Sequence, residues 1–327
     1  MKVFIPMSCY PDSFADNVRV TLESMGHETR TMGQVDHKKY WSLPRWGFRV
    51  AMERIRGNRP SRFDLRILKL AREFQPDMIL STTGEVHPEV LAELGKVCSG
   101  RRILWWGDPP ANSRKWGILD PGWDLVFMKD RSAVHKLRLV GRNAHLLHEA
   151  MNPVWHKPVG GQKNDSVVVA GNYYAYRQAV LLRLMGDGVP VRLYGSPPPP
   201  WAHPKIRMNH TGRYIVCEEK SRMFREGLAC LNTFNLTEGN SLNCRAFEIA
   251  GAGGLQLIEY RSAVEECFEP GKELLAFRTY EELLDQIDRA RKSPGEMAAI
   301  RDAGARRALA EHTYRHRLDV ILRVVND

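Results

Sequence analysis

The residues best suited to chemistry lie in one stretch, 231–258. An apolar strand and a polar loop lead there into a short helix, which is expected to end at the glycine-rich run 251–254. The side chain of Asn240 or Ser241 is expected to cap this helix by accepting from a free backbone N–H. A helix N-terminus of this kind presents N–H groups and a positive dipole end, so the stretch predicts a site for an anion.

Two charged side chains on the expected helix suit a phosphorylated ligand. The guanidinium of Arg245 has the forked shape that matches a phosphate group. Glu248, three residues further on the same face, could accept hydrogen bonds from sugar hydroxyls. An ordinary turn between strand and helix, with an Arg–Glu surface pair at i,i+3 spacing, explains the same residues equally simply. The local sequence leaves both interpretations open.

The elements that must position these residues alternate between strands and helices. This alternation predicts βαβ units and mostly parallel sheets. The chain of 327 residues is long enough for two such domains, and the Pro- and Gly-rich stretch 149–165 is expected to link them. Strands are expected at 2–7, 28–32, 77–81, 102–106, 125–129, 144–147, 167–170, 191–194, 206–209, 228–231 and 255–258.

Positive charge is concentrated in segment 38–72. Eleven Lys and Arg residues stand there against two acidic ones, which gives a net +9 out of +10 for the chain. Helices are expected at 47–57 and 61–74, and Trp41, Trp46, Phe48 and Phe63 are interleaved with the charges. Such a segment can contact an anionic acceptor, an anionic membrane surface or a nucleic acid. A solvated helical face with its aromatic residues in the core is the alternative.

Composition argues against several classes of protein. No run approaches the roughly 20 apolar residues of a membrane-spanning helix. The six cysteines are scattered without a C-x-x-C pair, so neither a zinc site nor a disulfide framework is indicated. Reduced thiols in the cytosol are therefore expected.

Motifs spread over most of the chain resemble a known family. The order and spacing of these motifs is similar to that of the CgeB-type spore-maturation proteins, a branch of the two-domain GT-B glycosyltransferases. The matching residues are 76–80 (PDMIL), 105–109 (WWGDP), 169–172 (VAGN) with Arg177, 193–195 (LYG), 243–248 (NCRAFE) with Gly253 and Gly254, 268–273 (FEPGKE), 280–283 (YEEL) and 312–314 (HTY) with Arg317.

The resemblance implies an α/β protein of GT-B type, with two Rossmann-like domains whose parallel sheets face a central cleft. It implies an acceptor domain at 1–155, a nucleotide-sugar domain at 156–311, and a C-terminal helix at about 312–327 that packs back on the first domain. The implied activity is that of a hexosyltransferase using a nucleoside-diphosphate sugar and a glycan, protein or lipid-linked acceptor. The donor is a substrate, and no cofactor is implied. A cytoplasmic location is expected, with a peripheral position on the inner membrane face as the variant.

The same resemblance assigns roles to particular residues. A metal is not expected, because GT-B transfer is usually metal-independent and the chain has no Asp-x-Asp pair. Candidates for a catalytic base on loops of the first domain are Asp108, Glu85 and His87. Asp108 leads, because the Trp-rich strand before it would desolvate it and raise its pKa. The donor-binding residues are expected to be Gly171, Asn172, Arg177, Tyr194, Gly195, Asn240, Ser241, Asn243, Arg245 and Glu248.

Two features of the sequence leave alternative functions open: a residue that departs from the family pattern, and the excess of positive charge in segment 38–72. Related enzymes often carry two Glu eight positions apart; Glu248 corresponds to the second, but Asn240 stands at the first. That departure motivates a non-catalytic GT-B-like binding protein. The basic segment motivates a nucleic-acid-binding protein or a DNA-modifying glycosyltransferase.

Overall fold

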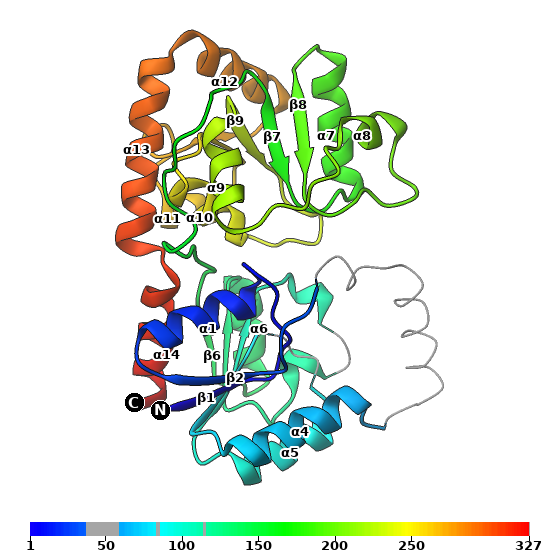
Figure 1. Cartoon of the computed structure of the whole chain (residues 1–327), viewed down its shortest axis with the longest axis vertical. Helices are drawn as coiled ribbons and strands as arrows, with labels where there is room; N and C mark the ends of the chain where they lie inside the picture. The colour runs from blue at the N-terminus through cyan, green and yellow to red at the C-terminus, as the bar shows by residue number, and fades with distance from the viewer. Residues whose placement is uncertain (37–58, 83–85, 114–115, 327) are drawn as a thin grey trace. The chain divides into compact units, whose positions relative to one another are not determined.

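The computed structural model describes residues 1–36, 59–82, 86–113 and 116–326. The chain divides into two compact units, Met1–Leu147 with Val320–Asp327, and His148–Asp319. Each unit is built on its own sheet, with helices packed alongside the strands (Figure 1). All strand pairs within the two sheets are parallel, as the alternation of strands and helices predicts.

The sheet of the first unit has the strand order β2-β1-β3-β4-β5-β6. Its inner strands are continuous apolar runs, because a parallel sheet covered on both faces buries successive side chains. The elements are β1 (Lys2–Ile5), α1 (Phe14–Ser24), β2 (Glu28–Thr31), α4 (Arg62–Phe74), β3 (Met78–Ser81), α5 (Pro88–Val97), β4 (Arg102–Trp106), η1 (Pro110–Asn112), η2 (Gly117–Leu119), β5 (Leu125–Met128), α6 (Arg131–Leu139) and β6 (Ala144–Leu146).

The sheet of the second unit has the strand order β11-β10-β9-β7-β8. The elements are β7 (Val167–Ala170), α7 (Ala175–Gly186), β8 (Val191–Tyr194), α8 (Pro204–Asn209), α9 (Cys217–Glu226), β9 (Ala229–Asn232), α10 (Cys244–Gly251), β10 (Gln256–Glu259), α11 (Ser262–Cys267), β11 (Leu275–Phe277), α12 (Tyr280–Lys292) and α13 (Pro294–Glu311). A last helix, α14 (Tyr314–Asn326), begins in the second unit and ends in the first.

Most expected elements are present, with two differences among the described residues. The strand expected at 206–209 is wrong: these residues belong to α8, which starts with Pro204 and is capped by His203, whose Nδ1 accepts from Lys205 N at 3.1 Å. The strand β11 and the helix α11 were not expected. The helix expected at 47–57 lies outside the described residues.

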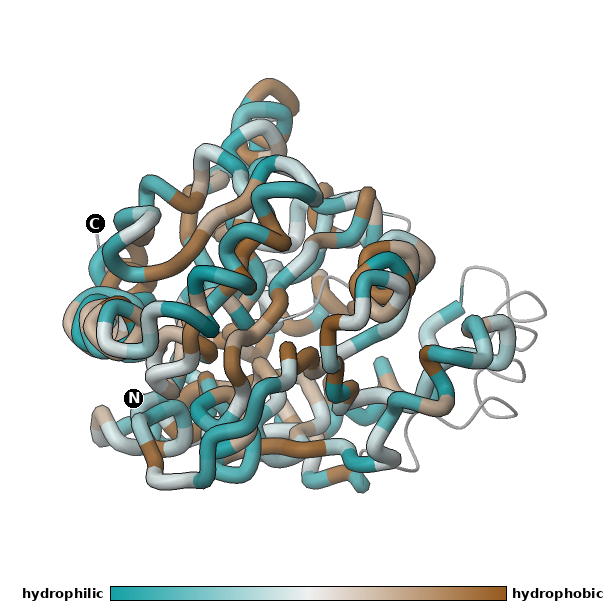
Figure 2. Tube along the Cα trace, turned by 90° about the horizontal axis from the view of Figure 1, so that it is seen from above, coloured by the Kyte–Doolittle hydropathy of each residue, from teal (hydrophilic) through white to brown (hydrophobic). Residues whose placement is uncertain are grey.

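Apolar residues supply the packing of each unit. Most strand residues of both sheets are buried, and the helices place one apolar stripe against them. In Figure 2 hydrophilic and hydrophobic residues alternate along the helices, as expected for helices with one apolar face. Among the described residues, no helix is both long enough and apolar enough to cross a membrane.

The stretch expected to link the domains is a packed part of the second unit. Met151 forms an isolated bridge with Thr313, and Asn152 and His156 are buried. The side chain of Ser221 on α9 donates to Trp155 O at 2.8 Å. The backbone of the stretch 149–165 is therefore hydrogen-bonded to α9 and to the residues at the start of α14.

Candidate functional site

Three strands of the second sheet end close together at its carboxyl edge, where open α/β sheets bind ligands. Gly171 N donates to Tyr194 O at 3.0 Å, which joins the loop after β7 to the end of β8. A Cβ at Gly195 would lie 2.5 Å from Gly171 N, and the φ of Gly195 is +105°. Only glycine fits at residue 195, because both the close approach and the left-handed backbone exclude a side chain. The sequence-predicted Gly171, Tyr194 and Gly195 thus lie side by side.

Arg177 is a buried clamp between two of these loops. It lies in the first turn of α7, where Nη1 donates to Asn172 O at 2.8 Å. Its Nε donates to Thr233 Oγ1 at 3.0 Å and its Nη2 to Thr233 O at 2.6 Å. Burial lowers the pKa of Arg177 to about 10, and the guanidinium carbon lies 4.5 Å from the ring centre of Tyr174. Most of its hydrogen-bonding capacity is therefore used to hold the loops after β7 and β9.

The helix expected around Arg245 is α10, and its cap differs from the prediction. Asn243 caps α10, because its side chain accepts from Ala246 N at 3.2 Å. Its amide also exchanges two hydrogen bonds with Asn232 at the end of β9, at 3.0 and 3.1 Å. The expectation that Asn240 or Ser241 caps this helix is therefore wrong. The sequence contains three Asn or Ser side chains within four residues, and only the tertiary pairing with Asn232 selects one of them.

Asn240 and Ser241 have other partners. Asn240 Oδ1 accepts from Ala263 N at 3.2 Å and its Nδ2 donates to Ser262 Oγ at 2.6 Å, so Asn240 is hydrogen-bonded to the first turn of α11. Ser241 Oγ donates to Glu238 Oε1 at 2.5 Å. Asn240 stands where related enzymes often carry the first Glu of the pair, and in this chain its amide holds the polar loop against α11.

Arg245 lies against the loop after β7. A Cβ at Gly171 would lie 2.7 Å from Arg245 Nη1 and 3.2 Å from Arg177 Nη1, so two guanidinium groups flank this glycine. Arg245 Nε is buried without a hydrogen-bond partner, and no carboxylate of the described residues forms an ion pair with Arg245. A guanidinium held at a sheet edge without a partner can bind an anionic ligand.

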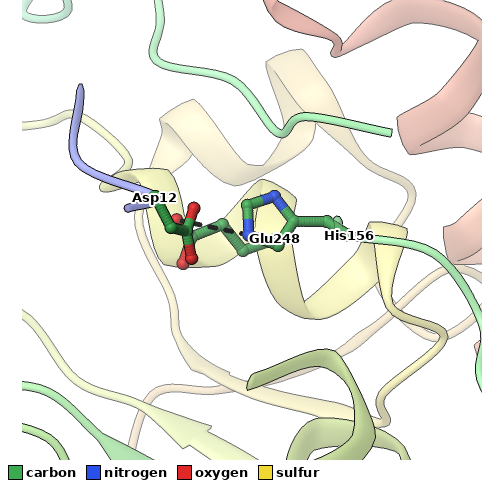
Figure 3. A group of neighbouring side chains, drawn as sticks. All are labelled: Asp12, His156 and Glu248. Atoms are coloured by element: carbon green, nitrogen blue, oxygen red, sulfur yellow. Dashed lines mark ion pairs between the residues drawn. The ribbon is translucent and has the colours of Figure 1, made fainter. Parts of the chain in front are cut away.

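Glu248 is buried rather than paired with Arg245 on the surface. It is 3% exposed, and its Oε1 lies 3.0 Å from Lys220 Nζ. The same oxygen lies 4.0 Å from His156 Nε2 (Figure 3). Glu248 Oε2 has no hydrogen-bond partner among the described residues. Sequence reasoning missed Lys220 and His156. The available signal was the position of Lys220 on the apolar face of α9, at i,i+3 and i,i+4 spacing to Met223 and Phe224.

The candidate catalytic bases of the first unit lie in different surroundings. Asp108 is exposed after β4, so the expected desolvation of its carboxyl is wrong. His87 is buried and caps α5, since its Nδ1 accepts from Glu89 N at 3.3 Å. Glu85 lies outside the described residues.

The sequence of the second unit matches a known family. Residues 177–323 match the model of the family described as glycosyl transferase-like. This range contains Arg177, Lys220, Arg245 and Glu248. No curated protein sequence matches the chain.

The whole chain is similar in fold to solved structures. Sucrose-phosphate synthase from Thermosynechococcus elongatus superposes with a TM-score of 0.69 at 12% identity, over 99% of this chain and 98% of that one. HepE from Anabaena, in complex with UDP-glucose, gives 0.67 at 11% identity over 99% of both chains. AviGT4, a glycosyltransferase involved in avilamycin A biosynthesis, gives 0.65 at 13% identity, over 100% and 97%. The chain therefore has the α/β fold of the GT-B glycosyltransferases, with two parallel sheets.

Proposed function

We propose that this protein is a glycosyltransferase that moves a hexose from a nucleoside-diphosphate sugar to an acceptor hydroxyl. The observation that carries the proposal is Arg245, a guanidinium without an ion-pair partner among the described residues that lies beside Gly171 at the carboxyl edge of the second sheet. The family match over 177–323 supports it. So does the fold shared with HepE, whose structure contains UDP-glucose.

The donor diphosphate binds along the loop after β7. Arg245 and the positive end of the α10 dipole contact its oxygens, and the buried charge of Arg177 lies on the same side. Gly171 and Gly195 allow the two loops and the guanidinium of Arg245 to approach one another closely, because neither glycine carries a side chain. The free Oε2 of Glu248 accepts from the ribose hydroxyls.

The reaction breaks the bond between the sugar and the diphosphate. Negative charge develops on the departing phosphate oxygen, and cations that are already in place stabilise this charge without reorganisation. Transfer then needs neither a metal nor a further cofactor. In an inverting reaction a base takes the proton of the acceptor hydroxyl, and Asp108, Glu85 and His87 are the candidates.

The acceptor is a glycan, a protein or a lipid-linked molecule with negative charge, bound through the first unit. The basic segment 38–72 supports this assignment and would also suit a cytoplasmic enzyme held at an anionic membrane surface. Reversing the charges of Arg54, Arg56 and Arg59 is expected to weaken acceptor binding and leave donor affinity intact. Unchanged acceptor kinetics in this triple variant would refute the role of the segment.

A panel of nucleotide sugars tests the donor half of the proposal. Uridine, guanosine, cytidine and thymidine diphospho-sugars are added separately, and the melting temperature is recorded. A true donor at 100 times its Kd stabilises the protein by about 2.7 kcal/mol, or roughly 5–10 °C for a unit of this size. Release of the free nucleoside diphosphate on adding acceptor then shows transfer. Absence of any shift and any release contradicts the proposal, whereas binding without release identifies a non-catalytic binding protein.

A further inference from the structure

Three side chains form a buried polar cluster in the second unit: Lys220 on α9, Glu248 on α10 and His156 in the segment before β7. Their exposed fractions are 7%, 3% and 0%. A buried ion pair rarely stabilises a protein more than apolar residues of the same volume would. The stability of the fold therefore does not by itself explain why these three polar side chains are buried together.

The cluster engages only one of the two oxygens of Glu248. Lys220 Nζ lies 3.0 Å from Oε1. His156 Nε2 lies 4.0 Å from the same oxygen (Figure 3). His156 Nδ1 accepts from Asn152 N at 3.0 Å, so in the neutral ring the hydrogen is on Nε2, toward Glu248. The other oxygen, Oε2, is buried without a hydrogen-bond partner among the described residues.

The two partners of Glu248 are themselves held in place. Ser221, next to Lys220, donates to the carbonyl of Trp155, next to His156, at 2.8 Å. The backbone N–H of His156 donates to Asn152 O at 2.7 Å, which closes a tight turn. Lys220 and His156 are therefore fixed relative to each other by α9 and by this turn.

We propose that Lys220 and His156 are positioning residues, which hold Oε1 of Glu248 so that Oε2 accepts from the ribose hydroxyls of the donor. This inference rests on the proposed function. It makes the ammonium of Lys220 the group that orients the carboxylate and compensates its charge, while neither residue touches the nucleotide. The consequence is a preference for ribose over 2′-deoxyribose that depends on Lys220.

The test compares affinities for matched nucleotides by isothermal titration calorimetry. UDP, GDP, CDP and ADP are each paired with the 2′-deoxy counterpart, and the ratio of the two Kd values is measured. The wild type is expected to favour the ribose form by about tenfold or more, the amount expected for a hydrogen bond to a charged acceptor. Lys220→Met is expected to reduce this ratio towards one, and Lys220→Arg to restore part of it.

Two further variants make the outcome decisive. Arg222→Met removes a cation from the exposed face of the same helix, where it pairs with Glu218 at 3.3 Å, and is expected to leave the ratio unchanged. His156→Gln provides a second measurement if Lys220→Met does not fold. A folded Lys220→Met or His156→Gln protein with the wild-type ratio overturns the inference. If no ribonucleoside diphosphate binds the wild type, the proposed function fails first and this inference fails with it.

A second, independent observation concerns a hollow in the first unit. It has a volume of about 250 Å³ and lies between α1, β2 with the residues after it, and α4. Arg19, Arg30 and Arg66 line it together with one carboxylate, Glu23, which pairs with Arg19 at 2.8 Å. Among the described residues, Arg30 and Arg66 have no ion-pair partner.

The geometry points to a binding subsite for an anionic group, a phosphate or a carboxylate, in this hollow. Arg30 and Arg66 are exposed residues that line one small hollow, so an anion between their guanidinium groups is attracted by both. Arg19 contributes less, because Asp16 at 2.7 Å and Glu23 already neutralise it. The hollow is large enough for a sugar that carries the anionic group.

Thermal shifts with inorganic phosphate, glucose 6-phosphate, glucuronate and glucose test this second inference without any donor. Stabilisation by phosphate alone indicates a site for the free anion, and stabilisation only by the charged sugars indicates an anionic sugar. Arg30→Gln and Arg66→Gln are expected to weaken the response at least tenfold. Lys69→Gln on α4, whose side chain does not line the hollow, should leave it unchanged. No response to any anion, or equal losses in all three variants, overturns the inference.

Discussion

Replacing Arg245 with alanine should separate ligand binding from stability. The side chain has no ion pair among the described residues and a buried Nε without a hydrogen-bond partner. Its removal therefore breaks no hydrogen bond of the described structure. We expect the free energy of unfolding to change by no more than about 0.5 kcal/mol, which is a shift of roughly 1–2 °C in Tm.

The effect on the donor should be much larger. Arg245 Nη1 would lie 2.7 Å from a Cβ at Gly171, so the guanidinium is in place to contact a diphosphate in this loop. One hydrogen bond between charged groups contributes about 1.5–3 kcal/mol, which corresponds to a loss of about 10- to 150-fold in affinity. Isothermal titration calorimetry with UDP, or with the nucleotide that stabilises the wild type most, measures this loss.

A matched variant makes the result interpretable. Arg306 is exposed on α13, and Arg306→Ala removes the same charge from the same unit. It is expected to retain the donor affinity of the wild type within about twofold, since exposed charges at a distance are screened by salt. If Arg245→Ala binds donor as the wild type does, or loses affinity only in proportion to a loss of stability, Arg245 has no place in the donor site.

Three further predictions concern groups with structural partners. Arg177→Ala leaves the acceptors on Asn172 and Thr233 without their donor, so the free energy of unfolding should fall by about 3 kcal/mol or more and Tm by roughly 6–12 °C; a Tm within 2 °C of the wild type would contradict the clamp. Asn240→Ala removes the acceptor of Ala263 N in the first turn of α11 and should cost about 1 kcal/mol in denaturant titrations, with a smaller loss of donor affinity than Arg245→Ala. Burial, with the charge of Arg317 beside it, lowers the pKa of His312 from 6.5 to about 3. The unfolded chain therefore binds a proton that the folded protein does not, and stability should fall as pH falls from about 6.5 toward 3, more steeply in the wild type than in His312→Asn.

Periodicity and turn residues were enough to predict two parallel α/β units from the sequence, whereas the GT-B fold was implied by the family resemblance. Short apolar runs bounded by turn residues, such as 167–170 and 125–128, are typical of buried strands of a covered parallel sheet, and the helices between them carry one apolar stripe. Local sequence rules failed where a segment has a similar propensity for helix and for strand. The run around Ile206 reads as a strand, but Pro204 and the cap from His203 start a helix there.

Part of the candidate site could also be predicted from the sequence. A helix preceded by Asn and Ser and carrying Arg245 and Glu248 indicates an anion site, and the family resemblance adds the glycines at 171 and 195. These features are local, since they depend on residue type and on short spacing. The sequence could not separate Arg177, which uses its donors to hold loops, from Arg245, which retains them.

The sequence by itself thus determined the parallel α/β units and the location of a candidate anion site at the start of α10. Only the tertiary structure decided which Asn caps that helix, which guanidinium remains without a partner, and that Lys220 and His156 meet Glu248. The physical reason is the distance along the chain over which each kind of interaction acts. Secondary structure follows from backbone and side-chain preferences within a few residues, whereas a buried charge is compensated by whichever group the fold brings within about 4 Å, here from 28 residues earlier in the chain for Lys220.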